Sequence, residues 1–300
     1  MNRIAILVAL ATLTALDVQA QSEEEPAVES TLVIYDVETG ETRDVLSAEA
    51  LYEAPNWMPD GDHLVFNSEG HLYRVSVEGG EPELINTEGL DRLNNDHGIS
   101  PDGTRLVVSN GDGHIYTLPI EGGTPEQVTE HTPSYWHGWS PDGETLAYIA
   151  RRDDEQFDIY LIPTEGGEER TLAAHPAHED GADYTPDGQW VYFNSDRAGN
   201  FDIWRVRPDG SDLEQITSDT YEDWFPHPSP DGALIAFLSY APGTEGHPRY
   251  QDVRLRLMAP DGTDVREIVE LFGGQGTINV PSWSPDGQRF AFVRYRLLDE

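Results

Sequence analysis

The chain has 300 residues, a net charge of −38 at neutral pH, and neither cysteine nor lysine. Its 18 basic residues are all arginine, against 56 aspartates and glutamates. Such an acidic surface repels nucleic acid phosphates and anionic lipid headgroups, which excludes both as partners. The absence of cysteine excludes disulfides, thiolate nucleophiles and thiolate metal ligands.

The first twenty residues have the features of a secretory signal peptide. Arg3 supplies a short basic start, residues 4–16 are apolar, and residues 18–20 form a cleavage site. The apolar run is too short for a membrane-spanning helix, which needs roughly 20 residues, and no later run is long enough. We expect a periplasmic or secreted monomer without membrane insertion, with an acidic tail over residues 21–30 and one domain over residues 31–297.

Six copies of the tripeptide Pro-Asp-Gly divide the chain into periods. Successive copies are 42, 40, 45, 44 and 55 residues apart. Each copy precedes an apolar run that favours β-structure, and each period holds about four short strands separated by polar or glycine turns. This spacing is typical of β-propeller blades. The six prolines are Pro59, Pro101, Pro141, Pro186, Pro230 and Pro285.

The period around Pro186 shows the pattern. Residues 182–185 lead into the Pro-Asp-Gly turn, and residues 190–193 form an apolar second strand. Residues 202–206 read as a third strand and residues 213–217 as the last. The predicted order is therefore strand, Pro-Asp-Gly turn, strand, polar turn, strand, glycine turn, strand.

Neither end of the domain contains a whole blade. Residues 32–46 resemble the third and fourth strands of a period, and residues 280–295 supply only the first and second. Together they complete a sixth blade and leave no open sheet edge. The sequence thus predicts an all-β fold, a six-bladed β-propeller with four antiparallel strands per blade and a last blade closed by strands from both termini.

Some repeat copies carry a more specific pattern. Ser-Pro-Asp-Gly follows a tryptophan at Trp139 and again at Trp283, and Asn-Ser-Asp-Arg occupies residues 194–197. These motifs resemble the repeat of the TolB-type propeller, and the likeness covers residues 31–297. The resemblance implies a periplasmic scaffold that binds partner proteins through its propeller.

The periods differ most in the segments that lead into the innermost strand. In a propeller these segments gather at one mouth of the central channel, where binding sites are often built. Seven of the ten histidines lie there or in the long turn at residues 239–252. The predicted ligand-binding residues are His97, His137, His178, Asp180, Asp183, Arg197, Trp224, His227, His247, Gln275 and Asn279.

Two kinds of site are consistent with these residues. Imidazoles with carboxylate or amide oxygens suit a divalent transition metal, for which His97, His137 and His227 are the predicted ligands. Arg197 or Arg249 could hold a ligand carboxylate through two hydrogen bonds. The alternative is that the polar groups line a water-filled mouth or bind a peptide.

The functional hypotheses follow from these two kinds of site. The preferred one is an exported binding or scaffold module whose protein partner, glycan or small ligand binds at the histidine-rich mouth. Histidine ahead of Ser-Pro-Asp-Gly also resembles propeller-type oligogalacturonate lyases. That resemblance implies a metal-dependent, lyase-like enzyme acting on uronate-containing glycans. No residue is assigned a catalytic role.

The charge predicts a salt-adapted protein from a saline habitat. At about 1 M salt the Debye length is roughly 3 Å, so the repulsion between surface carboxylates is largely screened. We expect the melting temperature to rise between 0.05 and about 2 M NaCl in thermal unfolding experiments. A flat or falling curve would contradict salt adaptation.

Overall fold

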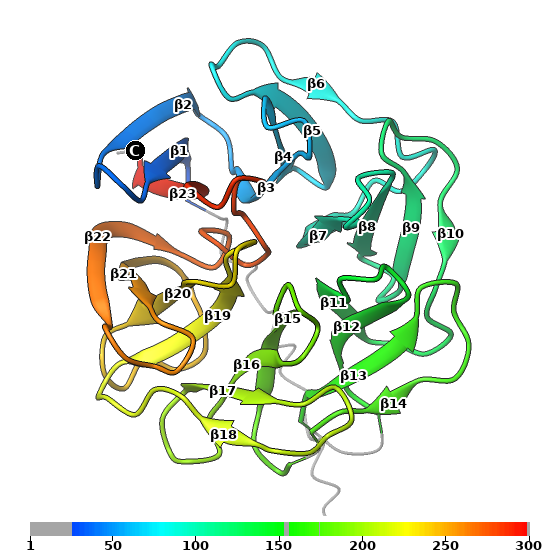
Figure 1. Cartoon of the computed structure of the whole chain (residues 1–300). Coiled ribbons are helices and arrows are strands. Elements are labelled where there is room, and N and C mark those ends of the chain that lie inside the picture. Colours follow the sequence, from blue (N-terminus) through cyan, green and yellow to red (C-terminus); the bar gives the residue numbers. More distant parts are fainter. Residues whose placement is uncertain (1–25, 153–155, 174, 299–300) are drawn as a thin grey trace, which may run out of the picture.

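The computed structural model describes residues 26–152, 156–173 and 175–298. The predicted signal peptide lies outside these ranges. The described residues form 23 β-strands and no helix, arranged as six sheets around a central axis (Figure 1). The described residues contain no helix that is long and apolar enough to cross a membrane. The predicted six-bladed all-β propeller is confirmed.

Five blades are four-stranded antiparallel sheets whose strands follow one another in the chain. The first strand of each lies nearest the axis (Figure 1). The first two blades are β3–β6 (Glu53–Trp57, His63–Ser68, His71–Ser76, Glu83–Leu84) and β7–β10 (Leu93–Ile99, Arg105–Asn110, Ile115–Pro119, Glu126–Gln127). The next three are β11–β14 (Ser134–Trp139, Thr145–Ala150, Asp158–Pro163, Arg170–Thr171), β15–β18 (Glu179–Tyr184, Val191–Ser195, Asp202–Val206, Glu214–Gln215) and β19–β22 (Glu222–Pro228, Ile235–Tyr240, Arg249–Met258, Arg266–Gly274).

The sixth blade joins the two ends of the chain. Strand β1 (Val28–Asp36) pairs antiparallel with β23 (Arg289–Leu297) along its whole length, and β2 (Thr42–Ala48) pairs with the other edge of β1. The innermost position is held by a single bridge between Trp283 and Phe290. The predicted closure by both termini is confirmed, although β1 starts within the segment predicted as a tail.

Alternate side chains of β1 pack on two different neighbours, as the period of a strand requires. Leu32 and Ile34 join a buried cluster with the β3–β6 blade. Val33 and Tyr35 join another with the β19–β22 blade. One strand therefore anchors the closing blade to both of its neighbours.

The six Pro-Asp-Gly segments that mark the periods are tight turns between the first and second strands. In the copy at Pro141, Asp142 Oδ1 accepts hydrogen bonds from the Ser140 hydroxyl and the Glu144 backbone N–H, at 2.6 and 3.0 Å. Gly143 has a φ of +77°, a conformation that disfavours residues with a Cβ. The turn chemistry read from the sequence accounts for this geometry.

Much of the sequence predicted to lead into the innermost strands is instead part of those strands. Strands β7, β11, β15 and β19 contain most of these residues, although His178, Gln275 and Asn279 lie outside the strands, and each strand is interrupted by a register shift. At such bulges the alternation of inward and outward side chains fails, so the usual period-2 signal of a strand is missing. The polar residues of these bulged strands consequently lie in the wall of the channel and not in surface loops.

Two inner strands touch at the axis side of their blades. A Cβ added to Gly98 of β7 would overlap the Trp136 ring of β11. The buried indole therefore occupies space that only glycine leaves open. Any larger residue at position 98 would displace it.

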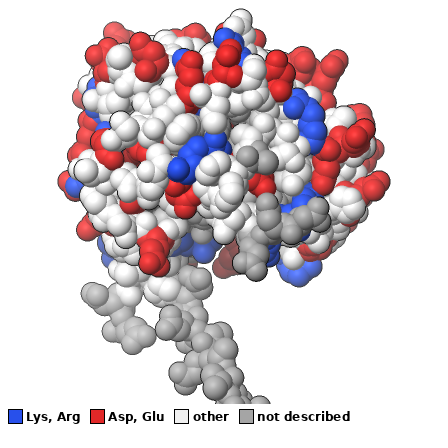
Figure 2. Space-filling view, turned by 90° about the horizontal axis from the view of Figure 1, so that it is seen from below, with Lys and Arg blue, Asp and Glu red and all other residues white. Residues whose placement is uncertain are grey.

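The surface is strongly acidic. Figure 2 shows aspartate and glutamate side chains scattered over the visible face, with fewer arginines between them. Several arginines bridge two carboxylates, as Arg74 does with Glu83 and Glu121 at 3.0 Å each. Such exposed pairs contribute little individually and weaken with salt.

We expect closure to limit the stability of the ring. Leu32→Ala should lower the free energy of unfolding by about 2–5 kcal/mol, because this fully buried side chain sits at the β1–β23 seam. Leu297→Ala is the matched control in the same pair of strands, 43% exposed, and should cost about 0.5 kcal/mol or less. Equal effects in denaturant titrations would contradict this role of the seam.

Candidate functional site

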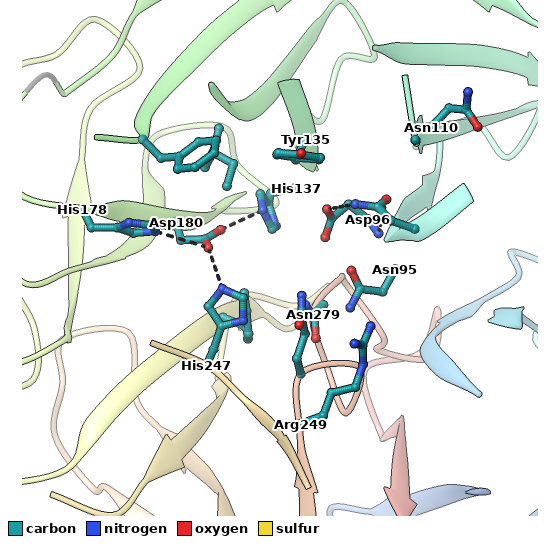
Figure 3. A pocket seen from close by; sticks show the side chains of 16 residues that line it. Asn95, Asp96, Asn110, Tyr135, His137, His178, Asp180, His247, Arg249 and Asn279 are labelled. Carbon is teal, nitrogen blue, oxygen red and sulfur yellow. Dashed lines mark hydrogen bonds and ion pairs between the residues drawn. The ribbon is translucent and has the colours of Figure 1, made fainter. Parts of the chain in front are cut away.

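A cavity of about 390 Å³ opens at one mouth of the channel (Figure 3). That volume lies within the range of small-ligand pockets. Its walls come from the inner strands and from the turns between second and third strands. The lining residues are Asn94, Asn95, Asp96, Asn110, Gly111, Tyr135, His137, Ile149, Phe157, His178, Asp180, Phe225, His247, Arg249, Gln275 and Asn279.

One carboxylate, Asp180, faces three histidines (Figure 3). Its Oδ1 lies 2.8 Å from His137 Nε2, and its Oδ2 lies 3.8 Å from His178 Nε2 and 3.5 Å from His247 Nε2. Asp180 and His137 are buried, whereas His178 and His247 are partly exposed. The group is a compact charged cluster on one side of the cavity.

Aromatic rings support the two outer histidines of this cluster. His247 packs edge-on against Trp224 and Phe225, with ring centroids 4.6 and 5.3 Å apart. His178 contacts Phe157 and Trp224 at 5.7 and 6.2 Å. These contacts restrict the imidazoles to orientations that face Asp180.

The opposite wall carries a second set of charges. Arg249 pairs with the buried carboxylate of Glu53 at 2.8 Å, and Asn95 Nδ2 donates to the same oxygen at 3.3 Å. Asp96 lies nearby, 7% exposed, and its Oδ2 accepts a hydrogen bond from Asn94 Nδ2 at 2.6 Å. Asp96 is thus held by an amide rather than by a cation.

Burial and neighbouring charge shift several pKa values in the cavity. Burial raises the pKa of Asp96 to about 6. Burial alone would lower the pKa of His137, but the Asp180 carboxylate outweighs it and raises that pKa to about 8. The pKa of Asp180 is in turn held well below its usual range, because His137 and the other imidazoles outweigh its burial. His137 and Asp180 therefore form an ion pair at neutral pH.

Bulges and backbone strain place several of these groups. His137 lies at the register shift of β11, and residues 94–96 span that of β7. Phe225 has a φ of +54°, unusual for a non-glycine residue. A bulge re-aims a side chain that regular pleating would direct elsewhere.

The three predicted metal ligands do not meet. His97 Nδ1 contacts Asn56 Oδ1 at 2.6 Å, and burial lowers the pKa of His97 to about 3. His227 contacts Asp183 Oδ2 at 3.1 Å and the Ile278 carbonyl oxygen at 2.6 Å. His137 contacts Asp180 instead. The described residues contain no group of three or more His, Cys, Asp or Glu side chains arranged to hold a metal ion.

The predicted ligand-binding residues divide into two sets, those that line the mouth cavity and those that do not. His137, His178, Asp180, His247, Gln275 and Asn279 line the mouth cavity, whereas His97, Asp183, Arg197, Trp224 and His227 do not. Asp183 lines a separate cavity of about 200 Å³ among tryptophans and prolines. Arg197 forms an ion pair with the buried Glu179, and Trp224 lies beneath the histidines.

Several lining residues were not predicted. Asp96 lies in a polar segment ahead of a Pro-Asp-Gly turn, and the prediction selected the neighbouring His97 instead. Tyr135 and Phe225 are aromatic residues of the inner strands β11 and β19. Asn110 and Phe157 come from second-strand ends and third-strand starts, where the repeat alignment carries no signal. Only the fold brings them to the mouth.

The fold and the cavity define a propeller with a polar pocket at one end of its channel. A family model described as the TolB beta propeller domain matches residues 111–246. A protein of Agrobacterium fabrum named "Uncharacterized protein Atu1656" is 50% identical over 274 residues, which cover 90% of this chain and 93% of the relative. The chain belongs to the TolB-like β-propeller family.

Solved structures agree on the architecture. A chain described as "The structure of putative TolB from Agrobacterium tumefaciens" is 49% identical, with a TM-score of 0.88 over 91% of this chain and all of that one. "Oligogalacturonate lyase in complex with manganese" is 16% identical, with a TM-score of 0.55 over 82% of this chain and 74% of that one. The second likeness concerns the fold alone.

The raised pKa of Asp96 predicts a pH-dependent effect of Asp96→Asn on stability. An acid whose pKa is higher when folded contributes stability that is lost as pH rises from its unfolded value, about 3.8, through about 6. Relative to wild type, Asp96→Asn should therefore gain up to about 3 kcal/mol between pH 4 and 7.5. Urea titrations at both pH values measure this gain. A difference that does not change with pH would contradict the buried charge.

Proposed function

We propose that the protein is an exported binding or scaffold module whose ligand binds in the mouth cavity. One observation carries the proposal: buried charged groups from different blades, including His137, Asp180 and Asp96, converge on a single open cavity. A propeller core does not need such groups, because burying charge costs free energy that apolar packing avoids. Membership of the TolB-like family supports a binding role.

Export is part of the proposal and rests on two features. Residues 1–20 have the sequence pattern of a signal peptide. The chain also contains no cysteine, so its folding is insensitive to the redox state of the compartment. Both features suit a protein that works outside the cytoplasm.

The second candidate, a metal-dependent lyase-like enzyme, has one feature in its favour. The buried His137–Asp180 pair beside Asp96 offers a proton donor and acceptors near neutral pH, which proton abstraction from a uronate would require. A metal would have to bind through residues other than the predicted set of His97, His137 and His227, because these have separate partners.

Blocking the mouth tests the binding proposal. Gln275 lines the cavity and is partly exposed, so Gln275→Trp should fill part of it. Gln288→Trp is the control, in an exposed Pro-Asp-Gly turn. In thermal-shift measurements with peptides, oligosaccharides, amines and metal ions, compounds that stabilise wild type should stabilise Gln288→Trp equally and Gln275→Trp less.

Two outcomes would contradict the proposal. Binding that is unchanged in Gln275→Trp would place the ligand elsewhere. Stoichiometric transition metal in the purified protein, together with oligogalacturonate cleavage that a chelator and His137→Ala both abolish, would favour the lyase.

A further inference from the structure

One carboxylate of the mouth cavity has no ion-pair partner. His137, His178 and His247 face Asp180, and Arg249 pairs with Glu53. Asp96 is the remaining carboxylate, and no arginine or histidine nitrogen of the described chain lies within 4.0 Å of it. The wall around Asp96 therefore carries negative charge that no neighbouring ion pair neutralises.

Hydrogen bonding around Asp96 leaves room for a donor. Asn94 Nδ2 donates to Oδ2, and no hydrogen bond within the described residues reaches Oδ1. Asn110, on the adjacent strand of the same blade, also lines the cavity, and its buried Oδ1 has no hydrogen-bond partner in the described chain. Buried acceptors without donors are costly, so a ligand that supplies donors would be stabilised here.

The shape of the free carboxylate edge favours one kind of cation. A guanidinium binds best to both oxygens of a carboxylate at once, and Asn94 already occupies Oδ2. An ammonium is compact and can donate to a single oxygen.

The rest of the wall suits an aliphatic stem. Tyr135, Ile149, Phe157 and Phe225 contribute apolar lining to the cavity. Aromatic faces also attract an ammonium within about 6 Å of the ring centre. The chain contains no lysine, so a second copy has no lysine side chain to insert.

We propose that the mouth cavity recognises a primary ammonium group on an alkyl chain, with Asp96 as the carboxylate that receives it. The inference rests on the proposed binding function and specifies its ligand class. Such a group can come from a lysine side chain of a partner polypeptide or from a free diamine.

Isothermal titration in about 1 M NaCl tests this inference, because salt screens non-specific attraction to the acidic surface more than a buried contact. The probes are 1,5-diaminopentane, a tripeptide Ala-Lys-Ala blocked at both ends, and the same tripeptide with the lysine Nε acetylated. We expect at least one of the two amines to bind and the acetylated peptide not to. Stronger binding by the peptide assigns the group to a polypeptide, and stronger binding by the diamine assigns it to a free amine.

Asp96→Asn should weaken amine binding by about 10- to 100-fold, because it removes the charge and keeps an oxygen for Asn94. Glu81→Gln removes an exposed carboxylate and should leave binding unchanged. Equal amine binding by Asp96→Asn, equal binding of the acetylated peptide, or no amine binding overturns the inference.

The mouth-blocking variants separate this failure from that of the proposed function. If no amine binds, but another compound binds to the wild-type protein and not to Gln275→Trp, the cavity binds a different class of ligand and only the ammonium inference fails. If no compound depends on the mouth, both proposals fail.

Discussion

The antiparallel pairing of β1 with β23 is the constraint on which the rest of the structure depends. It joins the ends of the chain and removes the two exposed edges that an open ring would have. Closure also sets how near the inner strands come to one another. The contacts of the mouth cluster, such as that between His137 of β11 and Asp180 of β15, join different blades and exist only at that spacing.

The inner strands supply most of the polar residues of the mouth cavity. Their bulges turn polar side chains toward the channel, and the aromatic residues beside them hold the imidazoles in place. The cost of burying charge is offset within the cluster, since His137 and Asp180 stabilise each other's ionised forms. Asp96 has no such ion-pair partner in the described chain, and burial raises its pKa.

Turn chemistry made the blades predictable from the sequence. Proline, aspartate and glycine act within a few residues, so Ser140, Asp142 and Gly143 form their turn wherever it occurs. The bulges depend on contacts between blades. In the sequence they are visible only as a loss of the usual alternation between apolar and polar residues along a strand. For that reason the sequence predicts segments that lead into the inner strands where the structure has bulged parts of those strands. His137 and Asp180 line the mouth cavity, whereas His97 and His227, directly after the bulges of β7 and β19, bond elsewhere in the channel wall.

The contact between Trp136 and Gly98 has a consequence for the kinetics of any ligand. The mouth cavity and the tryptophan-rich cavity that Trp136 lines share no residue. If the packed Trp136 ring keeps the two cavities apart, a molecule bound at the mouth leaves by the route along which it arrived. Its residence time would depend on the rim side chains, Gln275 and His247 among them, and not on passage through the ring.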